Sequence, residues 1–121
     1  MDLNYSPEDV AYRKHVRTWL EEHLPPSSPR TLEERKIWHR TLYDGGFLGM
    51  GWPKEYGGQG APPMEQAIVG VEMARAAAPA PTNGLGLGIV GPTIVVHGNE
   101  WQMKRYLQKI LTPEEMWCQI Y

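Results

Sequence analysis

A ten-residue segment rich in glycine and aromatic residues, Gly51–Gly60, most constrains how this chain can fold. Four of its residues are glycine and one is proline, yet it also carries two large rings, Trp52 and Tyr56. Glycine permits positive φ and close backbone approach, proline fixes an extended entry, and aromatic rings favour burial. The segment therefore predicts an ordered, packed loop between two helical regions.

Helix start and stop signals surround this loop. The cap Ser6, followed by proline and two acids, predicts a first helix that runs to about His23. Thr31 and Glu34 form a capping-box pattern that begins a second helix, which we expect to end at Gly45. The second helix carries the apolar residues Leu32, Ile37, Trp38 and Leu42.

Further punctuation predicts the helices that follow the loop. A third helix opens at Pro62 and closes before Pro79, and a last helix is capped by Asn99. Between them, the apolar stretch 85–96 is interrupted at Gly91, so it is either one kinked helix or two short pieces. The core-facing positions expected on the third helix are Met64, Ala67, Ile68, Val71, Ala74 and Ala78.

The last six residues, 116–121, change in character. They alternate aromatic and β-branched residues with polar ones, which predicts the start of a β-strand. A strand without a partner cannot satisfy its backbone groups. We therefore expect an all-α domain over residues 1–115, an up-and-down or orthogonal bundle of about five or six helices. Residues 116–121 would then be the first strand of a missing middle β domain, as in a truncated protein.

Composition excludes several classes of function. The net charge of −2 and the scattered basic residues argue against a nucleic-acid surface. No apolar run is long enough to insert into a membrane, and the single cysteine, Cys118, fits a reducing cytoplasm. Five tryptophans and six methionines favour a core rich in large side chains, and we expect some of them to face a partner surface.

The residues alone indicate no self-contained active site. The G-x-G-x-x-G spacing at 86–91 is typical of dinucleotide binding only after a strand, and the proline-rich stretch 79–83 precedes it here. We expect these small residues to allow close helix packing or to leave space for a ligand. The four histidines lack metal-ligand spacing, and Cys118 is expected to be a small apolar filler. No catalytic or metal-binding residue is predicted.

Motifs in a fixed order run through the whole chain. They are S-P-E-D from Ser6, the stretch from Leu42 to Gly60, N-G-L-G from Asn83, G-P-T-I from Gly91, H-G-N-E-W-Q-M-K-R-Y-L from His97 and W-C-Q-I-Y from Trp117. In this order the chain closely resembles the helical N-terminal domain of acyl-CoA dehydrogenases. The resemblance implies FAD as cofactor, an acyl-CoA substrate and the introduction of a double bond between Cα and Cβ of the thioester.

The resemblance also implies what the rest of such a protein supplies. A glutamate in a C-terminal domain removes the α proton, hydride passes to the flavin, and an electron-transfer flavoprotein receives the electrons. Homo- or hetero-oligomers are expected. By the same resemblance, Gln119 and Tyr121 are FAD contacts, and Leu85 and Leu87 line the acyl-chain tunnel. The alternatives are an ordinary strand aromatic for Tyr121 and core packing for the two leucines.

Three readings follow from the sequence. In the first, the chain is the N-terminal domain of an FAD-dependent acyl-CoA dehydrogenase, inactive alone and unable to retain FAD, because a cofactor site needs a formed cavity. In the second, it is a non-catalytic subunit or interaction module that completes a partner chain's site. The third, a nicotinamide-dinucleotide binder through Gly86–Gly91, is disfavoured because no strand precedes the glycines.

Overall fold

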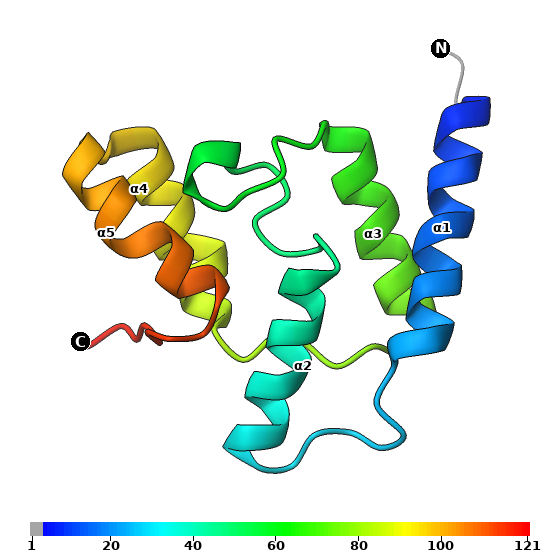
Figure 1. Ribbon diagram of the computed structural model, residues 1–121, viewed down its shortest axis with the longest axis horizontal. Helices are drawn as coiled ribbons and strands as arrows, with labels where there is room; N and C mark the ends of the chain where they lie inside the picture. The colour runs from blue at the N-terminus through cyan, green and yellow to red at the C-terminus, as the bar shows by residue number, and fades with distance from the viewer. Residues whose placement is uncertain (1–3) are drawn as a thin grey trace.

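The computed structural model describes residues 4–121, and all regular secondary structure within them is helical. The elements are α1 (Pro7–His23), α2 (Leu32–Asp44), the 3₁₀ turn η1 (Lys54–Tyr56), α3 (Pro63–Arg75), the π-helical turn η2 (Gly86–Val90), α4 (Gly91–His97) and α5 (Glu100–Leu111). The prediction of an all-α domain is confirmed. Helices α1 and α3 pack together at one end, α4 and α5 pack together at the other, and α2 lies between the two pairs (Figure 1).

The predicted helix starts are confirmed by their caps. The side chain of Ser6 accepts a hydrogen bond from the Asp9 amide at 3.1 Å, and Thr31 Oγ1 accepts one from the Glu34 amide at 3.2 Å. Asn99 caps α5 in the same way. Such caps satisfy backbone donors that have no partner inside the helix. The stretch 85–96 is one continuous helical run, in which the π-helical turn η2 leads directly into α4.

Helices α2 and α3 bury only some of the apolar residues that the sequence places on them. Met64 and Val71 on α3 are 47% and 51% exposed, while Glu72 is buried. On α2, Leu32 and Ile37 are 50% and 66% exposed. Ile68 on α3 and Trp38 and Leu42 on α2 are buried as expected, and the buried residues that the sequence did not single out are Val69 and Glu72 on α3 and His39 on α2. The expected stripe was wrong at Met64 and Val71 because apolar spacing alone does not show which side of a helix faces its neighbours.

The glycine-rich loop is packed into the core, as predicted. Trp52 in the loop is 8% exposed, and just before the loop a Cβ on Gly49 would lie 2.5 Å from Cδ2 of Leu111, which is fully buried at the end of α5. Gly49 has a φ of +59°, a conformation that glycine adopts without strain. The Ala61 amide donates to the Met50 carbonyl at 2.7 Å and closes the loop. Close packing and a backbone hydrogen bond therefore hold this region in place.

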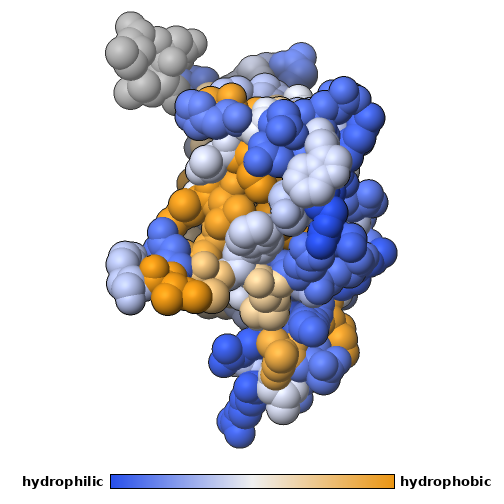
Figure 2. Space-filling view, turned by 90° about the vertical axis from the view of Figure 1, so that its left-hand side faces the viewer, coloured by the Kyte–Doolittle hydropathy of each residue, from blue (hydrophilic) through white to orange (hydrophobic). Residues whose placement is uncertain are grey.

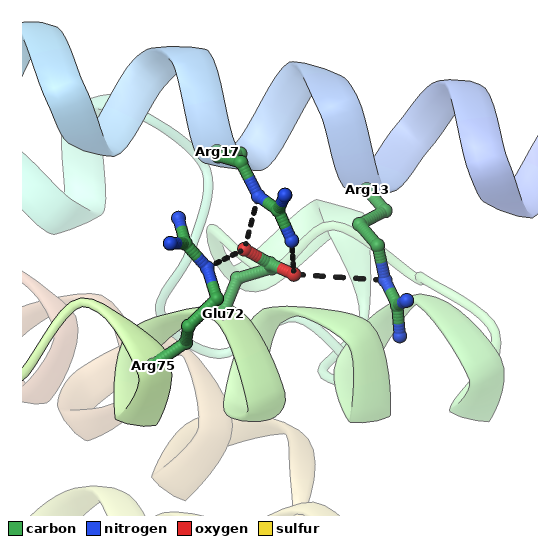
Figure 3. A network of polar contacts seen from close by, with 4 residues as sticks. All are labelled: Arg13, Arg17, Glu72 and Arg75. Carbon is green, nitrogen blue, oxygen red and sulfur yellow. Dashed lines mark hydrogen bonds and ion pairs between the residues drawn. The ribbon is translucent and has the colours of Figure 1, made fainter.

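A buried carboxylate joins α1 to α3 (Figure 3). Glu72 on α3 accepts two hydrogen bonds of 2.9 Å from the guanidinium of Arg17 on α1 and one of 2.8 Å from Arg75. Arg13 lies 3.6 Å away. The hydrogen bonds from Arg17 are the main reason that the pKa of Glu72 falls to about 2, against the opposing effect of burial. The carboxylate is therefore charged in the folded protein and ties the two helices together.

Apolar side chains remain exposed along the C-terminal third of the chain. They are Leu85, Ile89, Val96, Trp101, Met116, Ile120 and Tyr121. Figure 2 views the molecule from the side of α4 and α5 and shows apolar areas on that face. By contrast, Trp38 and Trp52 are buried in the core. The large side chains are therefore divided between the core and an uncovered surface, and the predicted partner for that surface stays a prediction.

Residues 116–121 have no regular secondary structure. A β-strand is defined by its hydrogen bonds to a neighbouring strand, and residues 4–121 contain no strand that could pair with it. The predicted strand is therefore not observed here. The division into a domain of residues 1–115 and a following strand at 116–121 stays a prediction. No helix in the described part of the chain is long and apolar enough to cross a membrane.

Candidate functional site

An open apolar groove of about 610 Å³ lies between the glycine-rich loop, α3 and the η2–α4 run. We call it the loop groove. Its walls are Phe47, Gly49 and Met50 from the segment between α2 and the loop, Gly51 and Trp52 from the loop, Gln66, Val69 and Gly70 from α3, and Leu87, Pro92, Val95 and Val96 from η2 and α4. Apolar walls with few polar groups are typical of sites that bind apolar ligands.

Small residues allow the walls of the groove to approach one another. A Cβ on Gly91 would lie 2.1 Å from Cη2 of Trp52, so the indole packs directly on the helix backbone. A Cβ on Gly51 would lie 2.8 Å from Nε2 of Gln66. That amide donates to the Ala61 carbonyl at 3.0 Å, which holds α3 against the loop. The loop groove is thus shaped by backbone positions that accept no side chain.

The two leucines predicted to line an acyl tunnel are placed differently. Leu87 lines the loop groove, whereas Leu85 is 36% exposed and does not. Ile89, four residues after Leu85 on the same helical run, is also exposed, at 46%. The structure therefore brings Leu87 to an apolar cavity, and it leaves Leu85 on the open surface of the same helical run.

The G-x-G-x-x-G spacing lies within helix, not in a strand-to-helix turn. Residues 86–90 form η2, Gly91 begins α4, and no strand precedes them among residues 4–121. The interpretation as a dinucleotide fingerprint is therefore wrong. Gly86 and Gly91 instead make room for Asn83 and Trp52, because a Cβ on either would collide with those side chains. A close approach to a neighbour is therefore observed at Gly91, against the loop side chain of Trp52, whereas a Cβ on Gly88 would meet nothing within 4 Å.

Asn83 was not identified from the sequence, although it organises this region. Its side chain is 2% exposed and sits at the entrance to η2. The side-chain NH₂ donates to the carbonyls of Ile110 at 3.2 Å and Glu115 at 2.9 Å, and Oδ1 accepts from the Trp117 amide at 3.1 Å. An asparagine before a glycine is typical of a turn. No sequence signal distinguished a turn former from this buried link.

The predicted flavin contacts lie at the exposed C-terminal end of the described residues. Gln119 is exposed and Tyr121 is fully so, and the Tyr121 hydroxyl donates to Gln119 Oε1 at 3.0 Å. Cys118 between them is also exposed, so the prediction that it fills an apolar space is wrong here. It was wrong because the segment packs against no second element at that point. Among the described residues, these exposed side chains enclose no cavity.

A second apolar hollow of about 380 Å³ lies beside this segment. Ile89 and Ile94 from η2 and α4 line it together with Tyr106 and Trp117. The rings of Tyr106 and Trp117 meet edge to face, with centroids 5.3 Å apart. Nε1 of Trp117 is buried and has no hydrogen-bond partner within residues 4–121. Trp117 therefore anchors the start of the C-terminal segment against α5.

The histidines form no metal site in the described chain. Groups of three or more potential ligands are absent from residues 4–121. His39 is fully buried, and its Nε2–H donates to the Leu111 carbonyl at 2.8 Å. Burial is the main cause that lowers its pKa, partly offset by that hydrogen bond. His39 therefore serves as a neutral link between α2 and the end of α5.

The loop groove and the helical arrangement define the class of this protein: an all-α domain that presents an open apolar groove. The family described as "Acyl-CoA dehydrogenase, N-terminal domain" matches residues 6–114. The chain belongs to the acyl-CoA dehydrogenase family, within its N-terminal domain. The family predicted from the order of motifs is thus confirmed.

Individual relatives support the same assignment. The acyl-CoA dehydrogenase IpdE1 of Mycolicibacterium smegmatis is 36% identical over 91% of this chain and 31% of its own length. The solved ChsE4-ChsE5 complex from Mycobacterium tuberculosis is similar over 93% of this chain and 29% of the solved chain, with a TM-score of 0.76 and 31% identity. An acyl-CoA dehydrogenase from Bacillus anthracis, solved with FAD, is similar over 93% of this chain and 20% of that one, with a TM-score of 0.71 and 26% identity. The chain spans about a third or less of these relatives.

Proposed function

We propose that this chain is the N-terminal domain of an FAD-dependent acyl-CoA dehydrogenase, which introduces a double bond between Cα and Cβ of an acyl-CoA thioester. The observation that carries the proposal is the loop groove, because it is apolar, open and lined by Leu87. An acyl chain is an apolar ligand that such walls would bind and shield from water. Leu85, on the same helical run, would extend the contact along the chain.

The residues at the C-terminal end fit one edge of a flavin site. Gln119 offers an amide and Tyr121 a ring and a hydroxyl, and both side chains are exposed. When bound, FAD supplies the acceptor for the hydride. Because these two residues enclose no cavity, other parts of the protein must hold most of the cofactor. The chain alone is therefore expected to retain no FAD and to have no activity.

None of the described residues that line the loop groove carries a carboxylate or another group that could remove the α proton. Glu72 is buried in its arginine cluster, on α3, with a pKa of about 2, so it is a poor base. The base must then come from another part of the whole protein, and an electron-transfer flavoprotein would receive the electrons. A cytoplasmic location fits the lone cysteine and stays part of the proposal.

The test is anaerobic reduction of the flavin in the whole protein by acyl-CoA thioesters of increasing length. The loss of flavin absorbance measures the reduction. Leu87→Asp places a charge in the groove and should raise KM for long acyl chains more than for short ones. Leu32→Asp, on the exposed side of α2, is the matched control and should leave KM unchanged. A whole protein that binds no flavin, or that no thioester reduces, would overturn the proposal.

A second candidate is a non-catalytic subunit that completes the site of another chain. The exposed apolar residues of the C-terminal third, Trp101 and Ile120 among them, favour it, because such side chains are commonly covered at interfaces. One similar solved structure is a complex of two proteins, ChsE4 and ChsE5. Mass measurement of the purified assembly distinguishes the candidates: two different chains sharing one flavin support this one, and a single type of chain opposes it.

A further inference from the structure

Asn83 joins two parts of the candidate site that are far apart in sequence. It precedes Leu85 and Leu87 by two and four positions, and its Oδ1 holds the amide of Trp117, two residues before Gln119. Asn83 therefore stands at the start of the helical run that carries the two leucines. Its side chain also binds the start of the segment that carries the predicted flavin contacts. We call this set of three hydrogen bonds the Asn83 clamp.

The clamp needs a side chain that donates two hydrogen bonds and accepts one, which an amide can do. The NH₂ donates to two carbonyls, those of Ile110 and Glu115, and the oxygen accepts from one N–H. A carboxylate accepts only, and a hydroxyl has a single proton to donate. Since Asn83 is 2% exposed, any backbone group it abandoned would lack water as a substitute partner. Asparagine is therefore the residue that this position requires.

The other tethers of the segment are more exposed. Glu115 pairs with Arg105 at 2.8 Å, but these side chains are 30% and 40% exposed. Exposed ion pairs contribute little, about 0 to 1 kcal/mol. The ring of Trp117 packs on Tyr106 and adds no directional bond from its buried Nε1. The Glu115 amide also donates to the Lys109 carbonyl at 3.2 Å. Together with this bond, the Asn83 clamp is the buried side-chain link that sets the direction of the chain after α5.

We propose that Asn83 is a positioning residue for hydride transfer. It holds the flavin edge formed by Gln119 and Tyr121 at a set distance from the acyl wall formed by Leu85 and Leu87. This inference rests on the proposed function. Transfer between two bound partners depends steeply on their separation, and a displacement of about 1 Å can cost on the order of a hundredfold in rate. Asn83 itself touches neither reacting partner.

The clamp is tested first in the 121-residue chain by following the Trp117 backbone amide by NMR. In Asn83→Asp, Oδ1 can still accept from Trp117, while the two donors are lost. Gly86→Ala keeps the asparagine at position 83 but should displace its side chain, because the added Cβ would lie 2.6 Å from Oδ1. Both should shift the Trp117 amide and speed its exchange with solvent. Gly84→Ala is the matched control, because its Cβ meets nothing within 4 Å, and it should preserve the signal.

The role in the reaction is tested in the FAD-loaded whole protein by the rate of flavin reduction at saturating acyl-CoA. Asn83→Asp and Gly86→Ala should slow this rate by about 10- to 100-fold with little change in KM. The rate of flavin reduction in Asn83→Asp, relative to that of wild type at the same pH, should rise at low pH, because a protonated carboxyl can donate to one of the two carbonyls. A purely structural role would lower the flavin content in both variants and show no such pH-dependent recovery.

The outcomes separate the two proposals. If wild type binds no flavin, or no acyl-CoA reduces it, the proposed function fails whatever the clamp does. If wild type is active and both variants lose the Trp117 amide signal yet reduce flavin at the wild-type rate, the positioning role is wrong. If Gly84→Ala disturbs the amide as strongly as Gly86→Ala, the clamp itself is wrong.

Discussion

The indole of Trp52 lies on the backbone of Gly91, so close that a Cβ at residue 91 would stand 2.1 Å from Cη2. This contact joins the glycine-rich loop to the first residue of α4, and Trp52 also lines the loop groove. A glycine that resembles part of a nucleotide motif is thus explained by a ring located 39 positions earlier. Shape complementarity of this kind leaves no room for even one added methyl group.

Gly91→Ala should therefore destabilise the chain, because the added methyl forces Trp52 out of its position. Overpacking a close contact costs about 1 to 3 kcal/mol. Gly88→Ala is the matched control on the same helical run, since its Cβ meets nothing within 4 Å, and alanine favours helix over glycine. Urea unfolding should place the two variants on opposite sides of wild type. Equal stabilities would contradict the contact.

Removal of the buried carboxylate should weaken the joint between α1 and α3. Glu72→Gln loses charge-assisted bonds to Arg17 and Arg75, at an expected cost of about 1 to 3 kcal/mol in the free energy of unfolding. Glu65→Gln is the control, because Glu65 lies on the same helix and is in none of the ion pairs of the described chain. Thermal unfolding of both variants checks this, and a similar loss in each would refute it.

The same carboxylate predicts how acid affects stability. The pKa of Glu72 is about 2 when folded, against an ordinary value of 4.5, so its contribution is present above about pH 5. It is lost as the pH falls toward 2, by at most about 3 kcal/mol. Unfolding measured between pH 5 and pH 2 should show a flatter profile for Glu72→Gln than for wild type. Parallel profiles would contradict the lowered pKa.

His39 predicts a second effect at milder pH. Burial lowers its pKa, so the unfolded chain takes up this proton before the folded one does. Stability should then fall as the pH drops below about 6.5, by no more than about 1.4 kcal/mol per unit. His39→Gln keeps a donor for the Leu111 carbonyl and should remove this dependence. His97→Gln changes an exposed histidine and should retain it.

The face that α2 turns inward is tested by two identical truncations. Leu42 is 2% exposed and Leu32 is 50% exposed. Leu42→Ala should cost about 2 to 5 kcal/mol through lost burial and a cavity. Leu32→Ala should stay within about 0.5 kcal/mol of wild type. Chemical denaturation of both variants measures the difference, and comparable losses would restore the face expected from apolar spacing alone.

Features that depend on neighbours in sequence could be predicted. Capping by Thr31 and Glu34, and the start of α5 at Asn99, are local hydrogen bonds between residues three apart, so the sequence pattern contains all the information they need. The same holds for the packed loop, where rings beside glycines indicate burial. The family was also readable, because it rests on the order of motifs along the chain.

Features that depend on distant partners could not be predicted. The inward position of Glu72 is explained by arginines on α1, 55 and 59 positions away, and a carboxylate without them would face water. Asn83 is buried because its three partners lie 27 to 34 residues later. The strand expected at 116–121 requires a neighbouring strand for its hydrogen bonds, and no local pattern can supply one.

The packing of the glycine-rich loop decides where this domain tolerates insertions. Gly49 and Gly57 both contact Leu111, and backbone bonds from Gly60 and Ala61 return to Trp52 and Met50, so one extra residue would disrupt several of these contacts. The proline-rich connection 25–29 carries no comparable backbone bonds in the described structure. Changes of length, whether engineered or evolved, should therefore accumulate between α1 and α2 and be rare between α2 and α3.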